Sequence, residues 1–284
     1  MGSVVYVGPD RLASFVLGRS IFPDLISSAE TRAEESGFLF HGRELWDGKL
    51  DETGRPICNG LIRDVVNWMR SRPIAGFDSP DGESPHPFEI FEAVLETLSP
   101  PDGDPLVLGP PRRVFIDDSR DIPTMRTPWE PEPVPVNLVA AGMRRILELT
   151  YLLVWTWYEQ LQVARIKRTE VTKRLFILVD EPETHLHPRW QRAILPALVQ
   201  VAKKLDADIE VQLFLTTHSP LVLASGETLV DAERDRLFHF DARDGAVVVD
   251  QLDWVKQGDA VGWLTSEVFG FTRGGSREGE LAIR

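Results

Sequence analysis

The sequence predicts an α/β protein built around a parallel sheet, and three patterns support this prediction. Residues 175–179 are five large apolar residues without the alternation of a half-exposed strand, which is typical of a strand buried on both faces. Residues 209–216 form a second run that we expect to be a buried strand. A long apolar helical segment, residues 138–167, precedes both. Helix and strand patterns therefore alternate along the chain, which implies parallel strands joined by right-handed crossovers.

The composition is that of an ordinary globular protein with an acidic surface. The chain has 284 residues, enough for one large domain or two small ones, and 31 basic against 44 acidic residues give a net charge of −13. This charge opposes broad attraction to nucleic acid or to anionic membranes, although a local basic groove is compatible with it. A single cysteine, Cys58, excludes an intrachain disulfide. The most apolar window, residues 146–158, is too short to span a bilayer, so we expect a cytoplasmic protein without a membrane partner.

Residues 1–136 are predicted to form a loop-rich α+β region or insertion. Apolar patterns predict a strand at residues 4–7, helices at 61–69 and 88–98, and short strands at 106–108 and 114–116. Residues 121–136 contain five prolines and are predicted to be a loop or linker.

Residues 137–284 are predicted to form the second unit. The expected elements are the central helix 138–167, a strand at 174–179, a helix starting at Pro188 and kinked at Pro196, and the strand 209–216. A short helix should follow, with Ser219 as its N-cap. The Asp244-Gly245 pair predicts a hairpin turn, and residues 260–269 a last helix.

Two acidic residues, Asp180 and Glu181, follow the apolar run 175–179 directly, and Pro182 ends the strand there. Ligands of open α/β sheets bind at the carboxyl ends of the strands. A carboxylate there can hold Mg²⁺, and a second one can orient or deprotonate an attacking water. The pair is therefore a candidate site for phosphoryl chemistry. The alternative is that both acids only cap the following turn.

A second polar group, Thr216-Thr217-His218-Ser219-Pro220, ends the strand 209–216. If the two strands are neighbours in a parallel sheet, His218 lies near Glu181. There it could donate to a γ-phosphate or fix the attacking water. The alternative is a histidine that only caps the next helix.

A third candidate is the start of the central helix, with the sequence Ala140-Ala141-Gly142-Met143-Arg144-Arg145. A turn of small residues at a helix N-terminus presents free N–H groups and the positive end of the helix dipole to a phosphate. The two arginines would add positive charge. The alternative is a tight packing turn followed by two solvated arginines.

Together these motifs resemble the C-terminal half of an ABC-type ATPase head. The closer resemblance is to the branch of SMC-, RecF- and OLD-like ATPases, which includes AAA-family ATPases of bacterial anti-phage systems. Residues 175–181 match the Walker B motif, and residues 182–188 match the Pro-Glu-x-His-Leu-His-Pro run that follows it in this branch. Residues 217–220 match the switch-histidine loop, and residues 139–144 lie where the signature motif is expected. The resemblance covers about residues 137–270 and implies a P-loop NTPase-like fold.

The resemblance also implies roles for individual residues. Asp180 would bind Mg²⁺, Glu181 would activate water, and His218 would sense the γ-phosphate. Residues of the 140–145 turn would contact ATP held by a second subunit, and His187, at the D-loop position, would lie at that interface; the turn residues concerned are Ala140, Ala141, Gly142 and Arg144. The expected ligands are therefore ATP and Mg²⁺, and the expected assembly is a homodimer or higher oligomer. Relatives couple ATP-driven dimerisation to DNA binding, DNA repair or release of a defence effector, which makes DNA and an effector protein candidate partners.

The chain departs from the family pattern in two places. Ala140 stands where the signature motif has a serine, so a hydroxyl contact to the γ-phosphate is missing. More importantly, the sequence contains no Gly-x-x-x-x-Gly-Lys-Ser/Thr, the Walker A motif that holds the phosphates. We therefore expect the Walker A lobe to come from outside this sequence, and the chain alone to bind ATP weakly or not at all.

Two other functions remain open on the sequence alone. A degenerate, non-catalytic ATPase module for dimerisation or partner binding would explain Ala140 and the missing Walker A. A metal-dependent hydrolase would use the ligand types gathered in two short stretches: Asp180, Glu181, Glu183, His185, His187 and His218. Against the hydrolase, His185 and His187 are two residues apart at the start of a helix, where such residues point away from each other.

Overall fold

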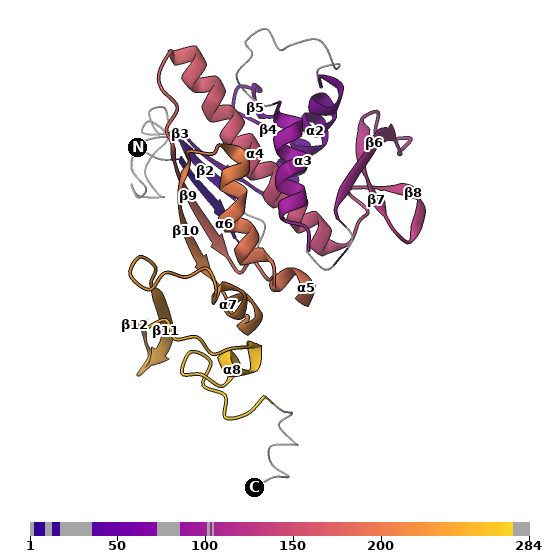
Figure 1. The fold of residues 1–284 in the computed structure, drawn as a ribbon. Helices are drawn as coiled ribbons and strands as arrows, with labels where there is room; N and C mark the ends of the chain where they lie inside the picture. The colour runs from indigo at the N-terminus through magenta and orange to yellow at the C-terminus, as the bar shows by residue number, and fades with distance from the viewer. Residues whose placement is uncertain are drawn as a thin grey trace.

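The centre of the molecule is a five-stranded sheet in the order β10-β9-β1-β2-β3 (Figure 1). The computed structural model describes residues 3–8, 13–17, 36–72, 86–100, 103 and 105–274. The strands are β1 (Ser3–Val7), β2 (Ala13–Leu17), β3 (Ser36–Phe40), β9 (Arg174–Asp180) and β10 (Glu210–Thr216). Strands β1, β9 and β10 are parallel, whereas β2 and β3 run antiparallel. The predicted α/β class with a parallel sheet is confirmed.

Strand β1 joins the sheet next to β9, with Val5 opposite Ile177. The chain passes through more than 160 residues between these two strands, including all of the predicted loop-rich α+β region that follows β1. The central sheet therefore combines strands from both sides of the boundary predicted between residues 136 and 137.

Helix α4 (Ala141–Lys167) is the central helix predicted at 138–167, beginning three residues later. Most of its side chains are buried, because it packs against the sheet and against α3 (Pro87–Thr97). Its aromatic residues bridge to both sides: Trp155 meets Phe40 edge-on at 5.3 Å between ring centroids, and Tyr151 lies 5.9 Å from Trp68 of α2 (Leu61–Arg70). The helices predicted at 61–69 and 88–98 correspond to α2 and α3.

Strands β9 and β10 are covered on one face only, so our prediction that both are fully buried is wrong. Leu175, Ile177 and Val179 are buried. Phe176 and Leu178 point to the opposite face, where they are only partly buried. On β10 the equivalent residue, Phe214, is 50% exposed. The prediction failed because the outward-facing residues are as apolar as the buried ones. An apolar run in the sequence does not show whether a second layer of structure covers its outer face.

Two helices, rather than one kinked helix, follow β9. Helix α5 (Pro188–Gln191) is short, and α6 (Ile194–Leu205) packs against α3 and β10. Pro196 causes no kink, because it lies in the first turn of α6, where its missing N–H would have no intrahelical partner.

The proline-rich segment 121–136 is not a linker, as we predicted, but forms two strands of a three-stranded sheet. The strands are β6 (Val107–Arg113), β7 (Asp121–Thr127) and β8 (Glu130–Pro135), and the sheet lies beside α3 (Figure 1). The N–H of Val136 donates to the carbonyl of Pro123 on β7. Backbone directions alternate along a strand, so the nitrogens of Pro133 and Pro135 point away from β7, where their missing N–H groups cost no ladder bond.

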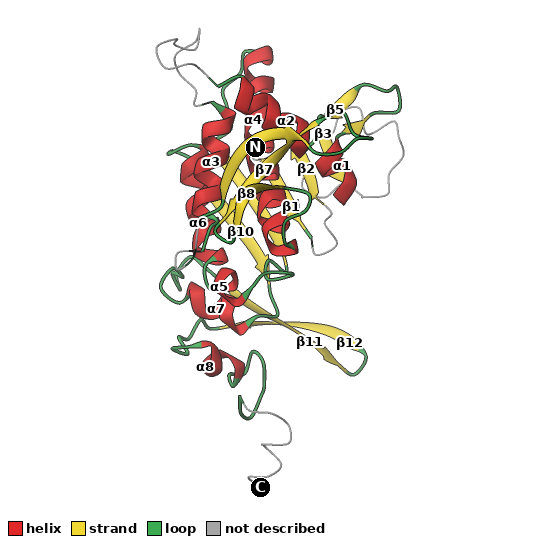
Figure 2. Ribbon diagram, turned by 90° about the vertical axis from the view of Figure 1, so that its right-hand side faces the viewer, coloured by secondary structure: helices red, strands yellow, loops and turns green. Residues whose placement is uncertain are grey.

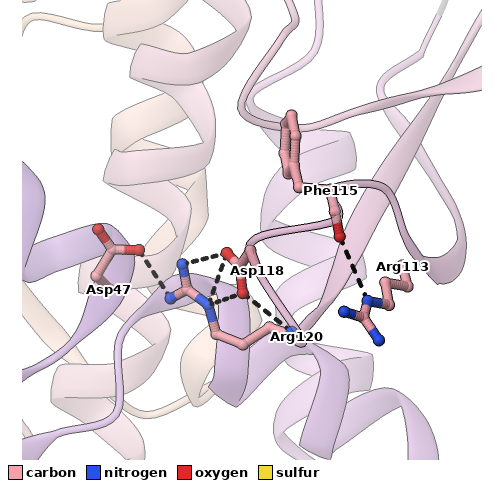
Figure 3. A network of polar contacts seen from close by, with 5 residues as sticks. All are labelled: Asp47, Arg113, Phe115, Asp118 and Arg120. Carbon is pink, nitrogen blue, oxygen red and sulfur yellow. Dashed lines mark hydrogen bonds and ion pairs between the residues drawn. The ribbon is translucent and has the colours of Figure 1, made fainter.

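The strand predicted at residues 114–116 is also absent, and these residues belong to the loop between β6 and β7. The side chain of Arg113 donates to the carbonyls of Phe115 (3.3 Å) and Ile116 (3.1 Å), which occupies the groups that a strand would pair. Further on, the guanidinium of Arg120 holds Asp118 and Asp47, which ties the loop to the end of α1 (Gly42–Asp47) (Figure 3). Its hydrogen bonds lower the pKa of the Asp118 carboxyl to about 2.

The remaining elements are small. They are β4 (Lys49–Leu50), β5 (Pro56–Cys58), α7 (Pro220–Gly226), β11 (Leu237–Arg243), β12 (Ala246–Leu252) and α8 (Ala260–Leu264). The hairpin predicted around Asp244-Gly245 is β11–β12, which extends away from the central sheet (Figure 2). The last helix stops before residue 269, because the Thr265 and Ser266 hydroxyls bond back to carbonyls of α8. Within the described ranges no helix is both long and apolar enough to cross a bilayer.

Candidate active site

Asp180 is the last residue of β9 and lies opposite Thr216, the last residue of β10. The Thr216 hydroxyl donates to Asp180 Oδ1, and the Tyr6 hydroxyl of β1 approaches Asp180 Oδ2 at 3.5 Å. Three parallel strands thus bring oxygen-bearing side chains to one edge of the sheet. Carboxylate and hydroxyl oxygens are the donor types that Mg²⁺ prefers, so this part of the predicted site suits that ion chemically.

Glu181 turns the chain sharply after β9. Its backbone has φ = 47°, in the left-handed region that non-glycine residues rarely adopt. Its N–H donates to the Thr216 carbonyl (3.1 Å), and the Thr184 N–H donates back to the Glu181 carbonyl (3.1 Å). The turn therefore points the Glu181 side chain away from the strand, and Pro182 occupies the second position of the turn, where its fixed φ is favourable.

The structure brings Glu181 and His218 together, as the parallel arrangement predicts. His218 Nε2 lies 3.4 Å from Glu181 Oε1, in reach of a hydrogen bond or a charged pair. The His218 side chain is 85% exposed and that of Glu181 35% exposed, so both face open space at the edge of the sheet. A water bound beside this pair could donate to the carboxylate of Glu181 and accept from the imidazole of His218.

Three residues to which the ATPase prediction assigned no role also contact members of this site. Thr216 donates to Asp180, Thr184 donates to Glu181 Oε2 (3.1 Å), and Glu183 accepts two hydrogen bonds from the loop that carries His218. Threonines and glutamates are too common to be singled out by residue type. Their positions within the two motifs, after β9 and after β10, were the only signal that could have identified them. Which residues of the two motifs contact each other depends on the register of β9 and β10, and the sequence does not show this register.

The start of α4 lies against the turn that follows β9. A Cβ atom at Gly142 would come within 2.9 Å of the His185 carbonyl, so this close approach requires glycine. Ala140 is the N-cap of α4 and provides no side-chain acceptor, which leaves the first N–H groups of this 27-residue helix without a cap from that side chain. Ala141 is the first residue of the helix. None of these three described residues hydrogen-bonds to Asp180, Glu181 or His218.

The remaining predicted residues have other neighbours. Arg145, which we expected beside a phosphate or in solvent, is buried and donates to the Gly8 carbonyl (2.7 Å). Arg144 is partly buried, and its Nε atom is buried without a hydrogen-bond partner. His187 is the N-cap of α5, where its Nδ1 accepts from the Arg189 N–H (3.3 Å). In the described part of the chain, no group of three or more His, Cys, Asp or Glu side chains is arranged to hold a metal ion.

Comparison with known proteins places these motifs in one matched segment. Residues 132–224 match a family described as "AAA domain, putative AbiEii toxin, Type IV TA system". The match covers the start of α4, the acidic end of β9 and the His218 loop.

Two curated relatives match parts of the chain. Septu protein PtuA of Bacillus mycoides is 35% identical over 94 residues, which is 33% of this chain and 12% of PtuA. A protein named "Retron Vc95 probable ATPase", from Vibrio cholerae, is 43% identical over 49 residues, or 17% of this chain and 8% of that protein. The aligned segments are thus a small fraction of both relatives. The family match and these relatives confirm the resemblance to AAA-family ATPases of the defence type.

Among solved structures, the SMC head domain of Thermotoga maritima aligns with 86% of this chain and 74% of its own. The TM-score is 0.35 and the identity 15%. The fold class follows from the strand pairing of β1, β9 and β10 and needs no support from this similarity.

Proposed function

We propose that this chain supplies the metal- and water-positioning half of an ATPase active site. The observation that carries the proposal is the 3.4 Å approach of His218 Nε2 to Glu181 Oε1, beside Asp180 at the ends of two neighbouring parallel strands. In this proposal, Glu181 accepts a proton from the attacking water. His218 donates a hydrogen bond to an oxygen of the γ-phosphate that this water attacks.

Asp180 and Thr216 are the proposed ligands for Mg²⁺, which would neutralise charge on the phosphates. The fit is chemical: a carboxylate and a hydroxyl oxygen lie side by side, and Mg²⁺ commonly takes one or two carboxylates and completes its shell with water and phosphate oxygens. Asp180, Glu181 and Glu183 are all acidic, so without a cation this edge would repel ATP.

The start of α4 is the proposed contact to ATP bound by a second copy of the chain. The N–H group of Ala141, which has no side-chain cap and is partly exposed, suits a phosphate, and Arg144 adds a positive charge at the same turn. Gly142 is buried and allows the close approach to the His185 loop. Ala140 contributes no hydroxyl, which weakens this contact compared with a serine. We place His187 at the same interface, so that active sites form between two heads.

In this proposal the phosphate-binding Walker A lobe comes from outside this sequence and docks on the open edge of the sheet. β10 is the outermost strand of the described sheet, it is parallel to β9, and its residue Phe214 is half exposed on one face. Parallel strands are normally covered on both faces, so this side has the character of an incomplete core. A further parallel strand beside β10 would end next to Thr216 and the His218 loop, where the loop after it could hold phosphates.

The first test measures equilibrium binding of a fluorescent ATP analogue to the isolated chain in the presence of Mg²⁺. Without a phosphate-binding lobe we expect dissociation constants well above the micromolar range. Micromolar binding by the isolated chain would contradict the need for a second lobe.

The second test replaces Glu181 by Gln in the assembly that contains a Walker A lobe. We expect ATP binding to persist and hydrolysis to fall about a hundredfold or more, since a general base commonly contributes 10²–10⁴-fold. Glu170→Gln, an exposed glutamate between α4 and β9, is the matched control and should leave both unchanged.

The alternative is a degenerate module that dimerises or binds a partner without catalysis, which Ala140 and the missing Walker A favour. In that case Glu181→Gln changes neither nucleotide binding nor assembly. The Septu and retron relatives suggest anti-phage defence as the setting, with release of an effector protein or contact with DNA as the coupled event. The exposed basic residues Arg165, Lys167 and Arg168 at the end of α4 are the candidate DNA contacts.

A further inference from the structure

Glu183 occupies a position between the two loops that carry the candidate catalytic side chains. It belongs to the turn after β9, two residues beyond Glu181, yet its carboxylate reaches the loop after β10. Both of its oxygens are used there. Oε1 accepts from the His218 backbone N–H at 2.6 Å, and Oε2 accepts from the Thr217 hydroxyl at 2.8 Å.

These two contacts fix the loop more firmly than ordinary surface hydrogen bonds would. Hydrogen bonds to an ionised carboxylate are shorter and about twice as strong as neutral ones, and two of them restrict rotation as well as distance. The Thr217 hydroxyl also accepts from the Ser219 N–H (3.0 Å), which extends the restraint to the N-cap of α7. The backbone of His218 is therefore held from both sides by groups that depend on Glu183.

The next residue, Thr184, restrains Glu181 itself. Its hydroxyl donates to Glu181 Oε2 at 3.1 Å, which leaves Oε1 as the oxygen that faces His218 Nε2. One oxygen of the proposed base is thus bound and the other directed at the imidazole. Two adjacent residues, Glu183 and Thr184, act on opposite members of the same pair.

We propose that Glu183 and Thr184 are positioning residues that set the separation and orientation of Glu181 and His218. Glu183 clamps the His218 loop against the turn after β9, and Thr184 selects the oxygen of Glu181 that meets the imidazole. Neither touches the reacting atoms. Displacing a catalytic group by about 1 Å can cost about a hundredfold in rate, so such a clamp matters to a site whose two members come from different strands. The catalytic consequence rests on the proposed ATPase function, whereas the clamp itself does not.

The clamp is tested first on the isolated chain by NMR, without nucleotide. In Glu183→Ala we expect the His218 amide to exchange with solvent at least tenfold faster, and the contact between the His218 ring protons and the Glu181 methylene protons to disappear. Glu183→Gln keeps an acceptor for the His218 N–H and can donate to the Thr217 oxygen, so it should restore both signals. Glu170→Ala is the matched control. Unchanged exchange and an intact ring contact in Glu183→Ala would overturn the clamp.

The consequence is tested in the assembled ATPase with the same variants. Glu183→Ala and Thr184→Val should lower kcat about tenfold or more with less than a twofold change in KM, and Glu183→Gln should recover most of the loss. A normal kcat in Glu183→Ala, with altered NMR signals, would show that the clamp does not position catalytic groups and would overturn that part. If the unmodified assembly does not hydrolyse ATP, the proposed function fails, while the NMR comparison still decides the clamp.

Discussion

At the scale of single residues, a buried network of three polar side chains contrasts with the exposed candidate active site. The Cys58 thiol lies 2.9 Å from the Tyr151 hydroxyl, which donates to Asp64 at 2.7 Å, all between β5, α2 and α4. Burial raises the pKa of the Cys58 thiol to about 11, from an ordinary value of 9.0, and also raises the pKa of Asp64. The network keeps its thiol and phenol neutral at physiological pH, which suits a structural role.

This shift predicts a specific loss of stability in alkali. The thiol ionises above about pH 9 in the unfolded chain but resists ionisation in the folded protein. Its contribution to the free energy of unfolding is therefore constant below pH 9 and falls as the pH rises to about 11. The loss is about 1.4 kcal/mol per pH unit, or about 2–3 kcal/mol in all. Urea unfolding at pH 8, 9.5 and 10.5 measures this decline. Cys58→Ala should be less stable at pH 8 but should lose less stability with rising pH, and parallel curves for the two proteins would contradict the assignment.

At the scale of elements, α4 organises the fold because it is apolar on nearly every side. Its middle turns are buried against β1, β2 and α3, whereas its last turn emerges into solvent. The two ends of one helix therefore differ in how much a side chain contributes. Burial of a large aliphatic side chain is worth about 1.5–3 kcal/mol, and the cavity left by its removal adds to the loss.

The contrast along α4 is testable with two substitutions of similar chemistry. Leu153 is fully buried, and Leu153→Ala should lower the free energy of unfolding by about 2–5 kcal/mol. Ile166 is 80% exposed on the same helix, and Ile166→Ala should change it by less than about 0.5 kcal/mol. Chemical denaturation of both variants measures the difference. Equal effects would mean that α4 does not lie in the core as described.

At the scale of the whole molecule, the two strands that carry the candidate catalytic residues differ in their neighbours within the described sheet. β9 has neighbours on both sides, whereas β10 has one. The N–H of Glu210 donates to the Lys173 carbonyl, and Glu181 N–H donates to the Thr216 carbonyl, so even-numbered residues of β10 face β9. The N–H groups of Val211, Leu213 and Leu215 therefore point to the open edge.

Amide hydrogen exchange on the isolated chain should reveal this alternation within one strand. The amides of Gln212 and Phe214 should exchange slowly and those of Leu213 and Leu215 rapidly, by a factor of about ten or more, because only the first two are bonded to β9. Uniform protection along β10 would show that another segment or a second copy already covers the edge. Binding of the proposed Walker A lobe should slow the rapid amides alone.

Local chemistry explains which features were readable in advance. The apolar runs of β9 and α4, the proline that starts α5, the Ser219 cap and the Asp244-Gly245 turn each depend on a few consecutive residues, and the structure contains all of them. The approach of His218 to Glu181 was also predictable, since the carboxyl ends of neighbouring parallel strands meet at one edge. Local sequence preferences, together with the rule that parallel strands end at the same side of a sheet, were sufficient to predict these features.

The sequence by itself thus determined the α/β class and the set of acidic and histidine residues at the ends of two strands. Tertiary structure alone decided that β1 is the neighbour of β9, that β8 accepts prolines because their nitrogens face outward, and that Glu183 reaches across to the His218 loop. Each of these depends on register or on which face another element covers. Such pairings join residues far apart in the chain, and no local pattern of side chains encodes them.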